Sequence, residues 1–462
     1  MSNLTELRLT AREIFNKALK AVDSYEAVRG AIRTRGSKLI SCDTSIDLTT
    51  HPEVYSIAFG KAALPMAAAM EEVLGDRLAA GIISTNEMRY TARGSEGVNA
   101  SQVTSLRHKI FAGGHPKPNE QSLAAAQACF DLLKRSNKER ALIFFLISGG
   151  GSAMLEWPIS EDITLDDLRV ANKALVTSGA SISEINAVRR AFSAVKGGRL
   201  AGLAPGCDQV TLIVSDVPAG QEYDVASGPT LAPPPTELIP QDVVARYGLR
   251  SVLPETVLRV IDADQQTAIP ASNNSTLLRK HFVLLDNNSG LEAAGQAGRD
   301  HGFTVEIAKD ISDQSIEFGC IQLLNRLEQI GQWADISNGA CLVSGGEFSC
   351  PVPGSGIGGR NLESALRLAI EWDEHNRDSR TAPDFVALCA GTDGIDGNSP
   401  AAGAIVDSTT IARARAIRLD SQEFLNRSDS YSFFVALGDA ITTGVTGTNV
   451  RDLRILLQNR QR

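Results

Sequence analysis

Glycine and polar residues repeatedly follow short apolar runs in this 462-residue sequence, and these motifs contain most of the residues that could carry chemistry. In the first half of the chain they are FGK at 59–61, GGHP at 113–116, SGGGS at 148–152 and SDVPAG at 215–220. In the second half they are SGGE at 344–347, GTDGIDG at 391–397 and GDAITTGVTGTN at 438–449. Because the carboxyl ends of strands line the ligand crevice of open α/β sheets, this pattern predicts small-anion sites at strand ends.

The SGGGS motif offers an anion-binding turn. It follows the apolar run ALIFFLI, and its residues are Ser148, Gly149, Gly150, Gly151 and Ser152. Consecutive backbone N–H groups in such a turn could point at phosphate or substrate oxygens, with two hydroxyls beside them. A tight turn needed only for packing is the alternative. A nucleophilic serine is a weaker one, because no G-x-S-x-G elbow is present.

Two cations stand where helices are expected to begin. Lys61 follows an apolar run and opens the stretch KAALPMAAAMEEVL, where its ammonium and the helix N-terminus could together meet a negative group. Exposure on the protein surface without a role is the alternative for this lysine. Arg360 opens the run RNLESALRLAIEW, and its planar guanidinium suits bidentate binding of a carboxylate or a transferring phosphate.

The segment before Arg360 formally contains G-x-G-x-x-G, at Gly354, Gly356 and Gly359. A dinucleotide-binding fingerprint leaves a parallel strand directly, whereas Pro351 and Pro353 interrupt the approach here. We therefore interpret the segment as an anion loop. The chain also lacks G-x-x-x-x-G-K-[ST], so an ordinary P-loop kinase is not predicted.

Acidic residues in or near glycine-rich turns could bind Mg²⁺ or accept a proton. Mg²⁺ usually takes one or two carboxylates plus phosphate oxygens and water, and a carboxylate can also accept the proton of a substrate hydroxyl. Aspartate also favours turns for its own hydrogen bonds, which is the local alternative for each residue. The set is Asp216, Asp224, Glu347, Asp393 and Asp396.

Within this set, Asp216 is a candidate catalytic residue, Asp216 and Asp393 are candidate metal or base groups, and Glu347 is expected to orient a neighbouring group. His115, in GGHPKPN, could contact substrate or act as a base, or be an ordinary hydrogen-bonding residue of a turn. A further polar helix is expected from Ser183 to near Gly197. Most of its polar side chains should be solvated, although Arg189 or Arg190 could reach the cleft; they are Glu184, Asn186, Arg189, Arg190, Lys196 and Arg199.

Alternating strand-like and helix-like segments predict βαβ units with largely parallel or mixed sheets. The expected strands are 54–59, 82–84, 109–112, 142–147, 210–214, 282–285, 340–343, 385–389 and 433–437. The segment LAPPPTELIP, at 231–240, is the strongest break in composition, because three consecutive prolines neither extend a helix nor serve a central strand. We therefore predict two α/β/α three-layer domains, at 1–235 and 236–462, with an active-site cleft between them.

Composition excludes several classes of protein. The formal charge of −9 argues against a broad nucleic-acid surface, and the seven scattered cysteines contain no C-x-x-C pair, which indicates reduced thiols. The N-terminal residues have helical spacing, with Leu4, Leu7, Ala11, Ile14 and Ala18 on one face, and this helix could dock on either domain. The longest apolar run, 141–147, is far shorter than the roughly 20 residues that span a bilayer. We expect a soluble, cytoplasmic protein.

Seven segments in this order resemble the glycerate 2-kinase family, which joins a DUF4147-type N-terminal domain to a C-terminal MOFRL domain. The resemblance runs from about residue 55 to about residue 450. The segments are AFGKAALPM, GGHPKPN, ISGGGSAML, EINAVRRAFSAVKGGRLA, SDVPAGQEYDVASGPT, SGGEFSCPVPGSGIGGRN and CAGTDGIDGNSPAAGAIVD. The last of them includes Asn398, which we add to the candidate residues for binding substrate or phosphate.

This resemblance implies transfer of the γ-phosphate of ATP to the 2-hydroxyl of D-glycerate, giving 2-phosphoglycerate. It ties Lys61 and Arg360 most directly to catalysis. It implies ATP and Mg²⁺ as cofactors and D-glycerate as the small-molecule partner. The net charge and the short apolar runs predict no nucleic acid and no membrane as partners, and a homodimer is a candidate assembly. Proteins of this kind also carry the name hydroxypyruvate reductase, so an NAD(P)H-dependent oxidoreductase is the alternative activity, and a non-catalytic binding protein is a second one.

Overall fold

The chain folds into two compact units in this computed structural model, and each is described by itself. The N-terminal unit is Ser24–Leu284, and the C-terminal unit combines Met1–Asp23 with Leu285–Arg462. The structure describes residues 3–86, 89–90, 98–99, 107–234, 238–263, 277–332, 339–376 and 382–459.

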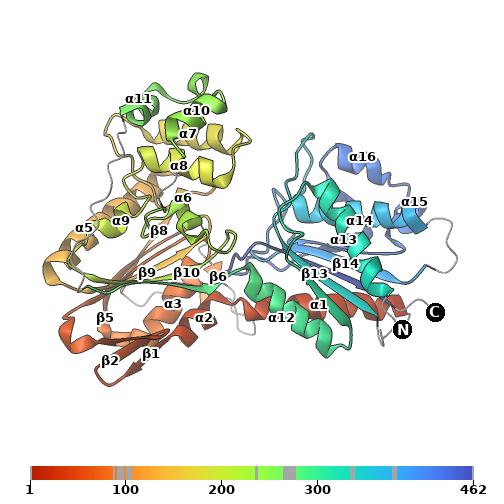
Figure 1. Ribbon diagram of the computed structural model, residues 1–462, viewed down its shortest axis with the longest axis horizontal. Helices are drawn as coiled ribbons and strands as arrows, with labels where there is room; N and C mark the ends of the chain where they lie inside the picture. The colour runs from red at the N-terminus through yellow and green to blue at the C-terminus, as the bar shows by residue number, and fades with distance from the viewer. Residues whose placement is uncertain are drawn as a thin grey trace. The chain divides into compact units, whose positions relative to one another are not determined.

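A six-stranded sheet forms the centre of the N-terminal unit (Figure 1), in the order β11-β10-β9-β4-β5-β8. The strand pairs among β10, β9, β4, β5 and β8 are all parallel. Each of the strands predicted in this part of the sequence is confirmed. The clearest are the fully buried β4 and β9, because buried parallel strands contain nearly continuous apolar runs. The bounds are β4 Val54–Phe59, β5 Leu78–Thr85, β8 His108–Ala112, β9 Leu142–Ser148, β10 Asp208–Val214 and β11 Arg279–Leu285.

Helices cover both faces of this sheet. Helix α3 (Ala63–Leu74) packs on β4, β5 and β9, with α2 (Ser24–Ala31) beside it. The apolar core of the opposite face includes residues of α5 (Glu120–Glu139) and α9 (Arg199–Gly202), together with Leu155, which follows α6 (Gly151–Met154). Short strands complete the unit: β1 Ile32–Arg35, β2 Lys38–Ser41 and β3 Thr44–Asp47 form an antiparallel sheet, and β6 Arg89–Tyr90 pairs with β7 Val98–Asn99.

Four helices of the N-terminal unit form a separate cluster with its own apolar core: α7 Leu165–Val176, α8 Ile182–Phe192, α10 Pro240–Arg246 and α11 Glu255–Ala263. Helix α7 starts after a capping box, in which the Thr164 side chain accepts the backbone N–H of Asp167. Helix α8 starts after a second capping box, at Ser181, and ends at Phe192 instead of near Gly197, because Ser193 has extended backbone angles. The described 3₁₀ segments are η1 Leu48–Thr50, η2 Gly75–Arg77, the kinked η3 Glu222–Ser227 and η4 Leu249–Ser251.

The compact units do not divide at the proline-rich segment. Helices α10 and α11 and strand β11 all follow that segment, yet they pack within the N-terminal unit. The division therefore differs from the boundary predicted between residues 235 and 236. Proline excludes helix and central strand locally, but it does not decide where the following segment packs.

The C-terminal unit is built on a mixed six-stranded sheet, in the order β12-β13-β17-β14-β15-β16. The β12–β13 pair is parallel, whereas β17 runs antiparallel between β13 and β14, and β15 continues antiparallel to β14 and β16. The prediction of parallel or mixed sheets is therefore confirmed for both units. The bounds are β12 Thr304–Ala308, β13 Ala340–Gly346, β14 Phe385–Gly391, β15 Gly403–Asp407, β16 Ala440–Ile441 and β17 Asp452–Gln458.

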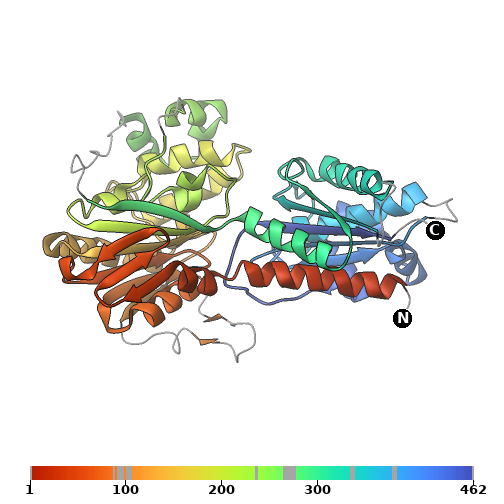
Figure 2. The same ribbon diagram turned by 60° about the horizontal axis from the view of Figure 1, so that its bottom comes forward.

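The N-terminal helix belongs to the C-terminal unit. Helices α1 (Asn3–Ala21) and α12 (Asn287–Asp300) lie side by side on one face of the sheet (Figure 2). The predicted apolar stripe of α1, including Ala11 and Ile14, is buried against this sheet. Arg8 adds ion pairs to Asp407 and, at 2.5 Å, to Asp439. Helix α1 therefore lies outside the unit that contains most of the domain predicted for residues 1–235. It packs against residues far away in the sequence, so its position could not be predicted locally.

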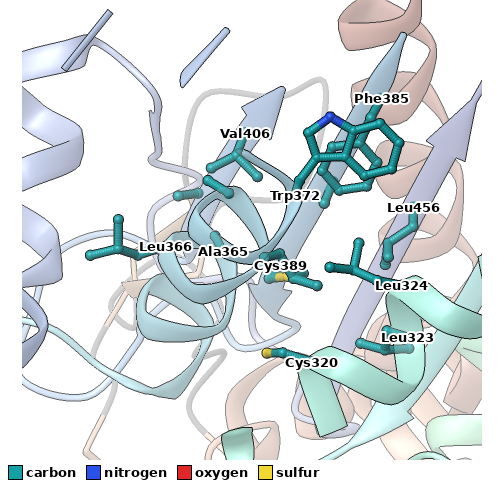
Figure 3. Close-up of a cluster of buried hydrophobic side chains, with 14 of the residues drawn as sticks. Cys320, Leu323, Leu324, Ala365, Leu366, Trp372, Phe385, Cys389, Val406 and Leu456 are labelled. Carbon is teal, nitrogen blue, oxygen red and sulfur yellow. The ribbon is translucent and has the colours of Figure 1, made fainter. Parts of the chain in front are cut away.

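The opposite face of the C-terminal sheet carries a large apolar core (Figure 3), covered by α13 (Ile316–Gly331) and α14 (Arg360–Asn376). Trp372 of α14 stacks on Phe385 of β14 with ring centroids 4.3 Å apart. Cys320 and Cys389 are buried in the same core, and all seven cysteines are free thiols, as expected. Helices α15 Thr410–Ala416, α16 Ser421–Asn426 and α17 Ser430–Leu437 extend this side.

One predicted strand is wrong. The run 433–437 belongs to helix α17, and Phe433 and Phe434 are fully buried in the core. A short apolar run fits a buried helix as well as a strand, so periodicity alone could not decide between them. In the part of the chain that the structure describes, no helix is long and apolar enough to cross a membrane.

Replacing Ile14 with alanine should lower the free energy of unfolding of the C-terminal unit by about 2–5 kcal/mol, because a fully buried side chain leaves a cavity. Leu9→Ala on the same helix is the matched control. Its side chain is 49% exposed, so its effect should stay within about 0.5 kcal/mol. Urea unfolding of the full chain measures both, and equal destabilisation by the two variants would contradict the docking of α1 described above.

Candidate active site

Four of the predicted polar motifs lie at one edge of the N-terminal sheet. Lys61 follows the end of β4, His115 that of β8, SGGGS that of β9 and Asp216 that of β10. The register aligns these ends, since Phe59 pairs with Ile147 and Val214 pairs with Ser148. Because parallel strands end at the same edge, the structure brings these segments together where the sequence predicted an anion site.

The turn that carries Lys61 is fixed to the SGGGS turn. The backbone N–H of Lys61 donates to the carbonyl of Gly149 at 2.9 Å, and that of Ala62 donates to Ser148 Oγ at 2.9 Å. Gly60 has φ +113°, and a Cβ there would lie 2.4 Å from Ser148 Oγ. Only glycine fits this approach. Ser148 is fully buried, so its hydroxyl holds the Lys61 turn in place.

Gly150 brings two candidate side chains close to the same point. It has φ +81°, and a Cβ built on it would lie 3.2 Å from His115 Cδ2 and 3.3 Å from Lys61 Cγ. The side chains of Lys61 and His115 therefore flank the middle of the SGGGS turn. Lys61 is half-buried and His115 is exposed. We call Lys61, His115 and residues 148–152 the Lys61 cluster.

A buried ion pair supports the end of this turn. Lys196 and Glu156 form an ion pair with 1% and 0% of each residue exposed, and Lys196 Nζ also donates to the carbonyl of Ser152 at 3.0 Å. Ser193 Oγ donates to Glu156 Oε1 at 2.5 Å. Burial lowers the pKa of Lys196, and the charge of Glu156 opposes this shift. The prediction that Lys196 lies on a solvated helix face is wrong.

A second buried network involves Asp224 and the polar residues of α8. Arg190 Nη2 and Asn186 Nδ2 both donate to Asp224 Oδ1, at 2.5 and 3.0 Å. Arg189 Nε donates to Asn172 Oδ1 at 3.0 Å, and burial lowers the pKa of Arg189 to about 10. Glu184 is also buried. The predicted solvated face is therefore mostly a packed face, because these side chains find partners inside the unit.

Arg360 is the centre of the candidate site in the C-terminal unit. It is the first residue of α14, and its Nε donates to Asp452 Oδ2 at 2.5 Å. Its Nη2 lies 2.9 Å from Glu347 Oε1, so the neighbour that Glu347 was expected to orient is Arg360 itself. Burial acts to lower the pKa of Arg360, but the charges of Asp452 and Glu347 outweigh it and raise this pKa. We call Arg360, Glu347 and Asp452 the Arg360 cluster.

Asp396 fixes the start of α14. Its carboxylate accepts the backbone N–H of Asn361 at 3.1 Å and that of Leu362 at 2.8 Å. Gly359 permits this approach, since a Cβ there would lie 2.5 Å from Asp396 Cγ. Asn361 Nδ2 bridges Asp396 and Asp452, at 3.2 and 2.9 Å. Burial raises the pKa of Asp396 to about 7, although the backbone donors oppose this.

Two opposing effects act on the pKa of Asp452. Burial alone would raise its pKa, but the charge and hydrogen bond of Arg360 outweigh this and lower the pKa. Asp452 therefore stays a carboxylate that can hold the guanidinium. Asp452 is not among the residues predicted from the sequence, where the only signal near it is the glycine-rich segment 438–449.

The loop containing G-x-G-x-x-G does not have the context of a dinucleotide-binding turn. Strand β13 ends at Gly346 and α14 begins only at Arg360. A Cβ on Gly354 would lie 2.1 Å from the carbonyl oxygen of Arg427, so this glycine packs against another part of the chain. Asn398 holds the loop, because its Oδ1 accepts from the backbone N–H of Gly358 at 2.8 Å.

The two candidate metal carboxylates lie in different units, Asp216 in the N-terminal unit and Asp393 in the C-terminal unit. Asp393 Oδ1 accepts the N–H of Ile395 at 3.1 Å, the local bond that aspartate makes in turns. Within the described residues, no three His, Cys, Asp or Glu side chains group as they would around a metal ion. The protein carboxylates could therefore bind Mg²⁺ only if phosphate oxygens or water supplied most of its ligands.

Fold and clusters together define the class: a protein of two α/β units, with a lysine cluster at a parallel-sheet edge and an arginine cluster at a helix start. Two family models match this sequence, one in each half of the chain. The domain of unknown function DUF4147 matches residues 10–262, and the MOFRL family matches residues 340–452.

Relatives match nearly the whole chain. A D-glycerate 2-kinase from Thermotoga maritima is 34% identical over 97% of this chain and 98% of its own length. A protein from Agrobacterium vitis, provisionally named hydroxypyruvate reductase, is 34% identical over 98% of this chain and 95% of its own length. The crystal structure of glycerate kinase from Thermotoga maritima has a TM-score of 0.76 and 30% identity, and it covers 98% of this chain and 100% of that one. The chain therefore belongs to the glycerate kinase family with DUF4147 and MOFRL domains.

Proposed function

We propose that this protein is an ATP-dependent glycerate 2-kinase. The observation that carries the proposal is the similarity to the D-glycerate 2-kinase of Thermotoga maritima across 97% of the chain, which includes both clusters. In the proposed reaction, the 2-hydroxyl oxygen of D-glycerate bonds to the γ-phosphorus of ATP and the bond from that phosphorus to the bridging oxygen breaks. ADP leaves, and the hydroxyl proton passes to a base or to water.

Phosphoryl transfer depends mainly on positioning and on neutralising charge, so it needs fixed cations more than a strong nucleophile. The Lys61 cluster supports this requirement, because the backbone of Lys61 is bonded to the SGGGS turn beside it. We assign Lys61 to stabilising charge on the transferring phosphoryl group. The backbone of the SGGGS turn and the exposed His115 remain candidates for binding phosphate or substrate oxygens.

Arg360 fits the second role, orientation of the glycerate carboxylate or of the phosphoryl group. Its guanidinium is held by Asp452 at Nε and by Glu347 at Nη2, and its side chain is still 35% exposed. A guanidinium has five N–H donors, so these two partners leave others for a ligand. We retain Asp393 and Asn398 as candidates for binding substrate or phosphate in the same unit.

We propose that Mg²⁺ enters as a complex with ATP. Mg²⁺ usually keeps several waters and binds through phosphate oxygens and one or two carboxylates, which agrees with the sparse donor set. Bound there, the ion would neutralise phosphate charge. Asp216, half-buried after the end of β10, is our candidate for the protein carboxylate.

Asp216→Asn should therefore raise the Mg²⁺ concentration needed for half-maximal activity by about tenfold or more, because the amide lacks the anionic oxygen. Asp131→Asn, on the exposed face of α5, is the control and should leave that concentration unchanged. A lower kcat at every Mg²⁺ concentration, with the half-maximal concentration unchanged, would indicate that Asp216 acts as the base instead.

The product decides between this function and its main alternative. We expect ADP to form only when ATP and D-glycerate are both present, and NMR of the product should show phosphate on the 2-hydroxyl. The names of Agrobacterium vitis relatives favour a hydroxypyruvate reductase as the second candidate. Oxidation of NADH by hydroxypyruvate, together with no ADP from ATP and D-glycerate, would reject the kinase. A wild type that binds D-glycerate but never turns over would favour a binding protein.

A further inference from the structure

A chain of hydrogen bonds leads from the SGGGS turn into the buried interior of the N-terminal unit. Ser152 Oγ lies 2.6 Å from Ser227 Oγ, and Ser227 Oγ lies 2.7 Å from Asn186 Oδ1. Asn186 Nδ2 lies 3.0 Å from Asp224 Oδ1. Ser227 is fully buried and Asn186 is 1% exposed, so neither exchanges these partners with water.

The far end of the chain fixes the orientation of the Asn186 amide. Asp224 is paired with Arg190, and Ser183 Oγ donates to its other carboxylate oxygen at 3.0 Å. A carboxylate in such surroundings only accepts hydrogen bonds. Asn186 must therefore turn its NH₂ group to Asp224 and its carbonyl oxygen to Ser227, because the flipped amide would place two acceptors together.

This orientation fixes the hydroxyl hydrogens of both serines. The Asn186 carbonyl oxygen can only accept a hydrogen bond, so Ser227 donates its single hydroxyl hydrogen to it. The short contact between the two hydroxyls then needs the hydrogen of Ser152. The hydrogen of Ser152 thus points into the protein, and this hydroxyl can offer a ligand only its acceptor lone pairs.

Other contacts keep Ser152 in place. Lys196 Nζ donates to its carbonyl at 3.0 Å, and the residue is half-buried, so it is not closed off from small molecules. Two residues before it, Gly150 lies against the side chains of Lys61 and His115. Ser152 is therefore a fixed hydrogen-bond acceptor within the Lys61 cluster.

A fixed acceptor is unsuited to phosphate oxygens and also unsuited to base catalysis. A phosphate oxygen is itself an acceptor, so it gains nothing from a lone pair. The chain behind Ser152 reaches Asp224 only through an amide, which does not pass a proton on. Because the hydrogen of Ser152 is donated to Ser227, no base is placed to remove it, which argues against the alternative that this serine is a nucleophile. The ligand group that fits Ser152 is a hydroxyl that keeps its proton during the reaction.

We propose that Ser152 recognises the non-reacting 3-hydroxyl of D-glycerate by accepting its hydrogen bond. This proposal rests on the glycerate kinase function proposed above. Ser152 is then a substrate-binding residue that determines specificity. Ser227 and Asn186 are positioning residues that turn its lone pair toward the substrate.

D-Lactate provides the test, because it is D-glycerate without the 3-hydroxyl. Ser152→Ala should lower kcat/KM for D-glycerate by about tenfold, the worth of one hydrogen bond, and leave D-lactate unaffected. The ratio of kcat/KM values for the two acids therefore falls by the same factor. If D-lactate turns over too slowly, its inhibition constant against D-glycerate replaces kcat/KM. The KM for ATP should not change.

Two variants within the same network separate recognition from structural support. Ser227→Ala releases the hydrogen of Ser152 and should lower the glycerate-to-lactate ratio by a smaller factor than Ser152→Ala. Ser183→Ala removes another hydroxyl from Asp224 but is not part of the chain to Ser152, so the ratio should stay at the wild-type value.

Each contrary result has a separate meaning. Equal losses for both acids in Ser152→Ala would overturn the proposal and make Ser152 a structural residue. A raised KM for ATP with both acids would also overturn it, in favour of a phosphate contact. An unchanged ratio in Ser227→Ala would remove the positioning role. If wild-type protein forms no ADP from ATP and D-glycerate, the proposed function itself has failed, and this is known before any variant is made.

Discussion

Arg360→Lys is expected to lower kcat/KM for D-glycerate by about 10²–10³-fold while the protein stays folded. The charge is retained, so the loss measures the planar fork of the guanidinium. Arg360 directs Nε at Asp452 and Nη2 at Glu347. An ammonium has its three donors on one nitrogen atom, so it cannot meet both carboxylates and also present two parallel donors to a ligand.

The variant should remain folded because the start of α14 does not depend on the Arg360 side chain. Asp396 accepts the backbone N–H groups of Asn361 and Leu362, and both bonds survive the substitution. The buried Asp452 also keeps a cation nearby and retains its bond from Asn361. Urea unfolding of the variant checks this expectation.

Arg367→Lys on the same helix is the matched control. Arg367 pairs with Glu363 and Glu317 and has no contact with the Arg360 cluster in the described structure. Its kcat/KM should stay within about twofold of wild type, the range of a surface ion pair. If Arg360→Lys were as active as this control, planar recognition by Arg360 would be rejected.

The central strands of the N-terminal sheet could be predicted from the sequence because they are buried on both faces. Strand β4 has the predicted bounds, and β9 extends the prediction by one residue, to Ser148. In such strands a run of apolar side chains is itself the signal. The glycine motifs after them were equally visible, because tight turns at Gly60 and Gly150 require positive φ. The sequence therefore allowed the prediction that the segments of the Lys61 cluster meet at one edge of the sheet.

What the sequence could not supply is the choice of partner for a buried group. Lys196 and Glu156 are 40 residues apart, and Arg190 and Asp224 are 34 apart. Lys196 and Arg190 were therefore predicted on a mostly solvated helix, and Asp224 was predicted as a metal or base carboxylate. Asp452 is 92 residues from Arg360. The same applies to α1, whose apolar stripe was predicted although the sheet that buries it was not. These contacts depend on chain topology, which no local pattern encodes.

The second large effect is expected from Lys61. Lys61→Met should lower kcat by about 10²–10³-fold, because it removes one fixed charge from the developing transition state. Methionine keeps the unbranched stem beside Gly150. The turn itself should persist, because it is held by the backbone N–H groups of Lys61 and Ala62 and not by the ammonium. Binding of D-glycerate, measured by calorimetry, should change far less than turnover.

Lys109→Met is the matched control for this variant, since it removes an ammonium from the same sheet at an exposed position of β8. That ammonium lies 4.9 Å from the ring centroid of Phe111, a contact worth about 0.5–1 kcal/mol of stability at exposed sites. Activity of the control should therefore be close to that of wild type. If both variants lost activity equally, the effect would come from the net charge of the unit. If Lys61→Met alone kept full kcat, Lys61 would be excluded from stabilising the transferred phosphoryl group.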